Sequence, residues 1–328
     1  MKATRRSLCH RLTLVGLLCL SLSPPLLAKQ LSFHREANSL SYRWLPPKQL
    51  ADGAPQSLTL TLSAESNIRF FSAWRPEAVK RTLYTRILAA ARQTWPDVIF
   101  ELHQQPEWRL DYRHVEPSQL AELAQWLQEE EKTEFQTLLQ ENYLQQARDP
   151  LGVSGIKPDH TRIIAESGAE LGDAAEALLQ AAGGDEIAPR QLLTYLLAFV
   201  QSIPYDKLQS QDGSRGTGYL LPRQVLSENR GDCDSKVALL ATLLQYLRPE
   251  INQALIFIPN HALLGVAIPA QAGEESLSIG GESLLLLEPT GPAELPPGQL
   301  GPESQLYIHA GSYVAESLAS DTNSTPSR

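Results

Sequence analysis

Hydrophobic positions along this chain recur with two periods, one of two residues and one of three to four. At 57–62, leucines alternate with polar residues, which is the period of a half-buried strand. At 76–94 the apolar residues instead form one helical stripe, which ends before the Trp-Pro pair at 95–96. Two apolar runs at 98–102 and 108–112 predict a pair of strands joined by a turn. We therefore expect a small α+β unit in this part of the chain.

Stripes of leucine at helical spacing continue further along the chain. They predict helices at 117–147, 160–182 and 189–202. The segment 231–247 (GDCDSKVALLATLLQYL) differs because it is apolar around most of its circumference. We expect a buried helix there that starts near Cys233.

Proline and glycine divide the chain into two expected domains. The stretch 148–158 has the punctuation of a linker, so we place a boundary there between an N-terminal α+β domain at 29–150 and a C-terminal domain at 158–312. The glycine-rich stretch 212–219 lacks the strand before it and the helix directly after it that a phosphate cradle needs, so it is interpreted as a surface loop. Polar residues at 313–328 are expected to form a flexible tail.

The first 28 residues have the pattern of a secretory signal. A basic start is followed by an apolar run at 12–22, which two prolines interrupt before it is long enough to span a bilayer. We expect cleavage after Ala28, a periplasmic or secreted product, and no membrane span in the mature form. The net charge of −9 becomes −13 when the four basic residues of this segment are removed. Such an acidic chain argues against a nucleic-acid partner, which would need basic patches.

The positions of the cysteines leave one candidate residue for thiol chemistry. Two of the three lie in the signal segment, so Cys233 is the single thiol expected in the mature chain. Two interpretations are open, a small buried hydrophobic residue or a nucleophile. A position in the first turn of a helix favours the second, because backbone N–H groups and the helix dipole there lower the pKa of a thiol and can also bind an oxyanion.

Two strand-like runs follow, at 261–268 and 283–288. If they pair antiparallel, His261 lies opposite Glu288, and a carboxylate beside a histidine holds its tautomer and makes it a better base. Taken alone, each residue is more typical of an ordinary surface position. Gln224, nine residues before Cys233, is either a surface glutamine or a side-chain donor to an oxyanion.

The segments GDCDSKVALLATLL, NHALLGV and LLLLEPTG, within 190–292, together resemble the transglutaminase-like superfamily, whose fold is related to papain. The resemblance implies an α+β C-terminal domain with a buried helix against an antiparallel sheet. It also implies Cys233 as nucleophile, His261 as base and Glu288 as the orienting acid. This chain departs from the family pattern in three ways: Glu288 stands where Asp is more common, the interval from histidine to acid is longer, and no aromatic residue follows His261.

The expected function is therefore a cysteine-dependent hydrolase or acyltransferase that acts on amide or isopeptide bonds of a peptide or protein. We expect no cofactor and no metal, because the sequence has no closely spaced cysteine pair and no His-Glu-x-x-His run. The alternative is a non-catalytic module that binds peptides or serves as a scaffold, with a cell-envelope protein as a possible partner. The N-terminal domain is expected to shape or cover the catalytic cleft.

Overall fold

The computed structural model describes residues 29–46, 54–63, 76–208 and 218–318, together with residues 50, 66 and 68. The signal expected at 1–28 lies outside these residues, as do most of the glycine-rich loop and the end of the chain from 319. Helices and antiparallel sheets occur together, so the α+β class is confirmed.

A three-stranded antiparallel sheet opens the described chain. It consists of β1 (Lys29–Glu36), β2 (Ser39–Leu45) and β3 (Gln56–Thr61) in that order. Along β2, Leu40, Tyr42 and Trp44 alternate with exposed residues and are buried, which is the period of a strand with one covered face. The Trp44 ring packs edge-on against Tyr195 and Phe199 of the helix α4 (Pro189–Ser202).

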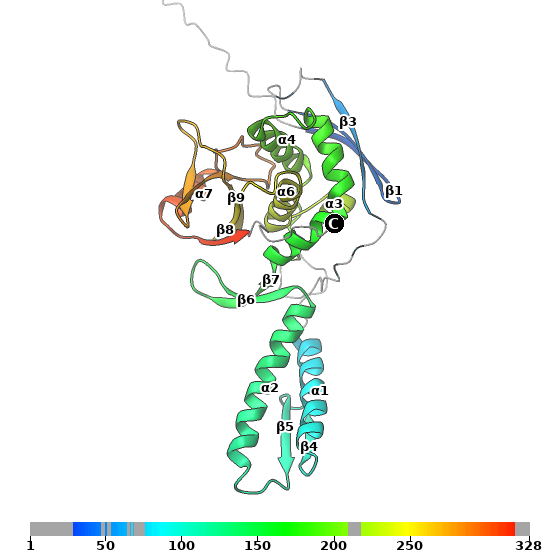
Figure 1. The fold of residues 1–328 in the computed structure, drawn as a ribbon, viewed down its shortest axis with the longest axis vertical. Coiled ribbons are helices and arrows are strands. Elements are labelled where there is room, and N and C mark those ends of the chain that lie inside the picture. Colours follow the sequence, from blue (N-terminus) through cyan, green and yellow to red (C-terminus); the bar gives the residue numbers. More distant parts are fainter. Residues whose placement is uncertain are drawn as a thin grey trace, which may run out of the picture.

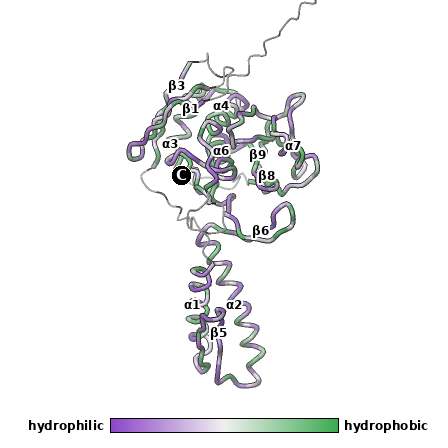
Figure 2. The backbone as a smooth tube through the Cα atoms, turned by 180° about the vertical axis from the view of Figure 1, so that it is seen from behind, coloured by the Kyte–Doolittle hydropathy of each residue, from purple (hydrophilic) through white to green (hydrophobic). Residues whose placement is uncertain are grey.

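Four helices form the centre of the molecule: α3 (His160–Ala182), α4 (Pro189–Ser202), α5 (Pro222–Glu228) and α6 (Cys233–Leu247). The helices expected at 160–182, at 189–202 and from Cys233 are confirmed. α6 is the central one, and it packs against the other three helices and the strand β9 (His261–Val266). Its leucines are buried, because these neighbours cover most of its surface. Figure 2 shows hydrophobic positions gathered along α4 and α6.

A five-stranded antiparallel sheet lies against α6. Its order is β10-β11-β9-β8-β12, with β8 (Gln253–Ile258), β9 (His261–Val266), β10 (Ser276–Ile279), β11 (Glu282–Leu287) and β12 (Val314–Leu318). One face joins the core around α6, and the other face is covered by α7 (Pro302–His309). Buried residues on both faces explain why β9 and β11 have nearly continuous apolar sequences.

The tail expected from residue 313 begins as a strand instead. Residues 314–318 are β12, which pairs with β8 from Val314–Phe257 to Leu318–Gln253. Backbone hydrogen bonds to β8 and the burial of Leu318 order this segment.

Another part of the chain extends away from these layers (Figure 1). We call it the arm, residues 76–141. Two long helices, α1 (Pro76–Thr94) and α2 (Leu120–Glu141), lie side by side with the hairpin of β4 (Ile99–His103) and β5 (Arg109–Arg113). The predicted helix at 76–94 and the predicted strand pair are confirmed, whereas the helix expected at 117–147 ends at Glu141 and the residues from Leu144 on belong to a strand. The arm has two small hydrophobic clusters of its own.

The remainder, which we call the body, contains residues 29–61 as well as 144–318. Leu40, Tyr42 and Trp44 belong to the same hydrophobic cluster as α3, α4 and α6. The stretch expected as a linker at 148–158 forms the turn and second strand of another hairpin, β6 (Leu144–Arg148) with β7 (Ser154–Pro158). The hydrophobic cores thus group the strands at 29–61 with the C-terminal half and set the arm apart.

Candidate functional site

The nucleophile predicted from the sequence occupies the first turn of α6. Asp232 caps the helix, because its backbone is extended and its carboxylate accepts a hydrogen bond from the Ser235 N–H at 3.2 Å. Directly before the cap, Gly231 forms a parallel bridge with Tyr205. Cys233 is half-buried and forms no disulfide.

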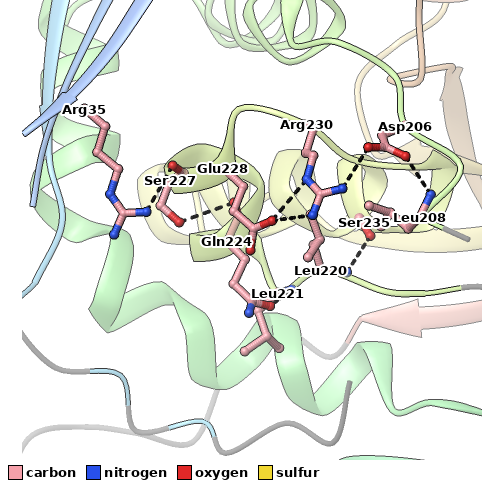
Figure 3. A network of polar contacts seen from close by, with 10 residues as sticks. All are labelled: Arg35, Asp206, Leu208, Leu220, Leu221, Gln224, Ser227, Glu228, Arg230 and Ser235. Carbon is pink, nitrogen blue, oxygen red and sulfur yellow. Dashed lines mark hydrogen bonds and ion pairs between the residues drawn. The ribbon is translucent and has the colours of Figure 1, made fainter. Parts of the chain in front are cut away.

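Polar contacts fix the loops that lead into α6 (Figure 3). Arg230 pairs with Asp206 and with Glu228, each at 2.8 Å. The Leu220 N–H donates to the Ser235 hydroxyl at 2.9 Å, so the chain before α5 is tied to the first turn of α6. These contacts hold the backbone on the N-terminal side of Cys233 in place.

Gln224 serves at the start of α5 in the same network. Its side-chain carbonyl accepts the Leu221 N–H at 2.9 Å, which satisfies an N-terminal donor of that helix (Figure 3). This contact accounts for a glutamine at this position. Its role as an oxyanion donor stays a prediction.

A tight hairpin places His261 beside α6. β8 and β9 are joined by Pro259 and Asn260, and Ile258 pairs with His261 across the turn. Asn260 has a φ of 58°, a left-handed conformation that asparagine tolerates better than most residues. The backbone N–H of Ala262, the next residue after His261, acts on the Cys233 thiol and lowers its pKa. The start of β9 therefore adjoins the thiol.

His261 and Glu288 are in contact, as predicted. The Nε2 atom of His261 lies 2.9 Å from Oε1 of Glu288. The register differs from the expected one by two residues: Leu264 pairs with Leu287, so Glu288 falls beside Leu263 rather than His261. A shift of two keeps both side chains on the same face of the sheet, which is why the pair still forms.

The carboxylate of Glu288 is held from a second side. Its Oε2 accepts the Gly301 N–H, at the N-terminus of α7, at 2.8 Å, and Ser304 adds a side-chain hydrogen bond. Burial by itself would raise the pKa of Glu288, but the hydrogen bonds from His261 and Gly301 outweigh burial and hold the pKa below its ordinary value. An ionised Glu288 assigns the proton of a neutral His261 to Nε2 and leaves Nδ1 as the free base.

The sequence-based expectation of a lowered thiol pKa is wrong for this structure. Burial, and after it the carboxylates of Asp234 and Asp232, raise the pKa of Cys233 to about 12. Backbone N–H groups of Asp234 and Ala262 act in the expected direction, but their effect is smaller. The helix terminus was correctly located. The prediction failed because it considered the helix dipole and neglected desolvation and the two flanking acids.

Those two acids form a pair that the sequence reasoning missed, with Asp232 buried and Asp234 partly exposed. Burial and mutual proximity raise the pKa of Asp232, and burial raises that of Asp234, so the pair holds a shared proton at neutral pH. Asp234 also contacts Nε2 of the fully buried His160 at 3.1 Å. Burial lowers the pKa of His160 to about 3, so this histidine is a neutral donor. The only available sequence signal was the acid on each side of the cysteine.

The site is accessible at one side. The side chains of His261 and Glu288 are about one-fifth and one-seventh exposed, and Tyr205 is 43% exposed. Burial raises the pKa of Tyr205, and the backbone bridge from Tyr205 to Gly231 places this residue beside the segment that leads into α6.

Comparison with known proteins adds no family to this description. A scan against protein-family models and a search of the curated proteins each give no match for the chain. Within the part of the chain that the structure describes, no three His, Cys, Asp or Glu side chains are grouped so that they could hold a metal ion. None of the helices described there is long and apolar enough to cross a membrane.

Proposed function

We propose that the protein is a transglutaminase-like enzyme that processes amide or isopeptide bonds of peptides or proteins through Cys233, His261 and Glu288. The observation that carries the proposal is the 2.9 Å contact between His261 and Glu288, at the start of a strand whose next backbone N–H, that of Ala262, lowers the pKa of the Cys233 thiol. A histidine fixed by a carboxylate beside a helix-terminal thiol is the arrangement that nucleophilic acyl transfer needs.

The mechanism follows from the protonation states. Since the thiol is neutral at rest, the nucleophile forms when Nδ1 of His261 takes its proton as the sulfur attacks the substrate carbonyl. The amides that approach the sulfur, those of Asp234 and Ala262, are available to stabilise negative charge near it. His261 then returns the proton to the leaving amine, and a thioester remains on Cys233.

The second half of the cycle regenerates the enzyme. Water, or an amine, loses a proton to His261 while it attacks the thioester carbonyl. The carbon–sulfur bond breaks, the proton goes back to the sulfur, and a carboxylic acid or a new amide leaves. Hydrolysis is our first choice over crosslinking. We further propose that this chemistry takes place in the periplasm or outside the cell.

One observation favours the non-catalytic alternative. The pKa of Cys233 is raised to about 12, whereas catalytic thiols in other proteins often have a lowered pKa. A module that binds peptides in the same place would need no thiolate. A test must therefore detect the covalent step itself.

The test measures two quantities at Cys233, the rate of alkylation by iodoacetamide and the formation of acyl adducts with a library of synthetic peptides, both by mass mapping. We expect His261→Ala to slow both by about a hundredfold or more, the range of a lost general base. His309 offers a matched control, because it contacts Glu275 at 3.0 Å in an exposed pair away from the thiol. His309→Ala should leave both rates unchanged. Equal alkylation in the wild type and in His261→Ala, with no peptide adduct, would leave the binding module as the function.

A further inference from the structure

The helix that carries the thiol also buries a lysine. Lys236 lies one turn after Cys233 and is 0% exposed. An ammonium group removed from water is costly unless its donors are satisfied, and it has three of them. Burial lowers the pKa of Lys236 to about 7, and the charge of Glu294 acts in the opposite direction. A hydrophobic side chain of similar length would fill this space with a smaller desolvation penalty, so packing alone does not explain the lysine.

The partners of Lys236 belong to two separate segments. Its Nζ donates to the backbone carbonyls of Ile203 at 2.7 Å and of Gln201 at 3.4 Å, both at the end of α4. It also donates to the carbonyl of Thr290, two residues after Glu288. One side chain on α6 thus connects the thiol helix to the end of α4 and to the loop that follows the acid.

A second buried side chain holds the same loop. Nε2 of Gln201 donates to the carbonyl of Glu288 and to that of Leu295, both at 2.9 Å. Between these points Gly291 has a φ of 64°, and a Cβ there would lie 2.8 Å from the Gln201 carbonyl oxygen. The loop is therefore pressed against the end of α4 too closely for a side chain, and its backbone position is fixed on both sides of Thr290.

We propose that Lys236 is a positioning residue that ties the Cys233 helix to the Glu288 loop and thereby fixes how the thiol faces the His261–Glu288 pair. This inference rests on the proposed function. Lys236 is fully buried, and it acts through the position of Glu288 relative to the thiol helix. Three hydrogen bonds to backbone carbonyls suit that role. They hold the backbone of the Glu288 loop and of the end of α4 directly, and they do not depend on the side chains of the loop.

The experiment is a double-mutant cycle with Lys236→Met, Glu288→Gln and the double variant, read by the rate of Cys233 alkylation and of peptide adduct formation. We expect Lys236→Met to slow both by about tenfold to a hundredfold, as a displacement on the order of 1 Å does. Because Lys236 acts through Glu288, the double variant should be no slower than Glu288→Gln alone.

The pH dependence separates positioning from stability. A displaced Glu288 no longer holds His261, so the midpoint of the alkylation rate against pH should move in Lys236→Met in the same direction as in Glu288→Gln. Thr242→Val is the matched control, because Thr242 is a buried polar residue on the same helix and its hydroxyl donates to the carbonyl of Ala238 within that helix. It should lower the melting temperature without moving the midpoint.

Each outcome decides one of the two proposals. If Glu288→Gln leaves the rates unchanged, the proposed function fails. If Glu288→Gln slows them but Lys236→Met does not, or if the two effects simply add, the function stands and the positioning role of Lys236 is overturned. Should Lys236→Met not fold, Gln201→Met removes the second attachment of the loop, and the same cycle with Glu288→Gln separates coupled from additive effects.

Discussion

The body and the arm both combine helices with antiparallel strands, but they differ in where their polar side chains lie. In the described residues, the buried polar and charged side chains lie in the body, among them His160, Asp232 and Lys236. The polar pairs of the arm, such as Arg86 with Glu141, lie at its surface. The arm buries apolar residues in two small clusters, whereas the body has one large cluster that extends from β2 to β12 and a smaller one between the five-stranded sheet and α7.

This difference shows where chemistry is possible. A buried polar group is costly, so it persists where neighbouring segments supply its partners, and those partners fix its geometry. Exposed pairs gain little and are rearranged easily. The body therefore has the fixed geometry that a reaction needs.

The largest expected effect tests whether the strands at 29–61 belong to the body. A chain that begins near Lys157 lacks Leu40, Tyr42 and Trp44, and the loss of one large aromatic side chain from a core already costs about 3 to 5 kcal/mol. A domain is stable by only about 5 to 15 kcal/mol, so this truncated chain should not fold. Near-ultraviolet circular dichroism and thermal unfolding measure the outcome. A cooperative transition in the truncated chain would show that the sheet is dispensable.

The next effect compares one substitution in the two regions. Leu123 in the arm and Leu240 in the body are both fully buried, and replacing either by alanine should cost about 2 to 5 kcal/mol. Because the arm has its own clusters, Leu123→Ala should speed hydrogen exchange in α1 and α2 only. Leu240→Ala should speed exchange throughout the body. Faster exchange of both regions in Leu123→Ala would mean that they unfold as one unit.

A smaller effect concerns the buried charge of the body. The folded pKa of Lys236 is about 7, against an ordinary value of 10.5, so between these pH values the unfolded chain binds the proton and the folded chain does not. The contribution of Lys236 to stability should therefore rise with pH across that window, by up to about 1.4 kcal/mol per pH unit. Urea unfolding of the wild type and of Lys236→Met from pH 7 to 10 isolates this difference. A constant difference would refute the lowered pKa.

The smallest effect comes from a charge pair of the arm. Arg86 contacts Glu141 at 2.7 Å on a surface that is open to solvent. Arg86→Met should change the free energy of unfolding by at most about 1 kcal/mol, and the change should shrink at high salt. Urea unfolding at low and high salt checks this. A larger loss that is insensitive to salt would remove the contrast with the buried groups of the body.

Much of the local structure was readable from the sequence. Helices at 160–182, at 189–202 and from Cys233 follow from leucine spacing, and they were predicted. The alternation of Leu40, Tyr42 and Trp44 in β2 is an equally clear period-two signal, although the sequence-based prediction did not include this strand. β12 could not be found in this way, because its five residues (VAESL) do not alternate between apolar and polar, and hydrogen bonds to β8, which lies far away in the chain, order it.

Some features of the candidate site could likewise be predicted from the sequence, and others depend on the tertiary structure. The sequence determined that a helix starts at Cys233 and that His261 and Glu288 face the same side of paired strands, since a two-residue error in register does not change the face. Only the tertiary structure decided the direction of the Cys233 pKa and the partners of Lys236. Periodicity is a property of residues that are close together in the chain, so the local sequence is enough to recognise it. Desolvation and hydrogen bonding depend on segments that are brought together only when the chain folds.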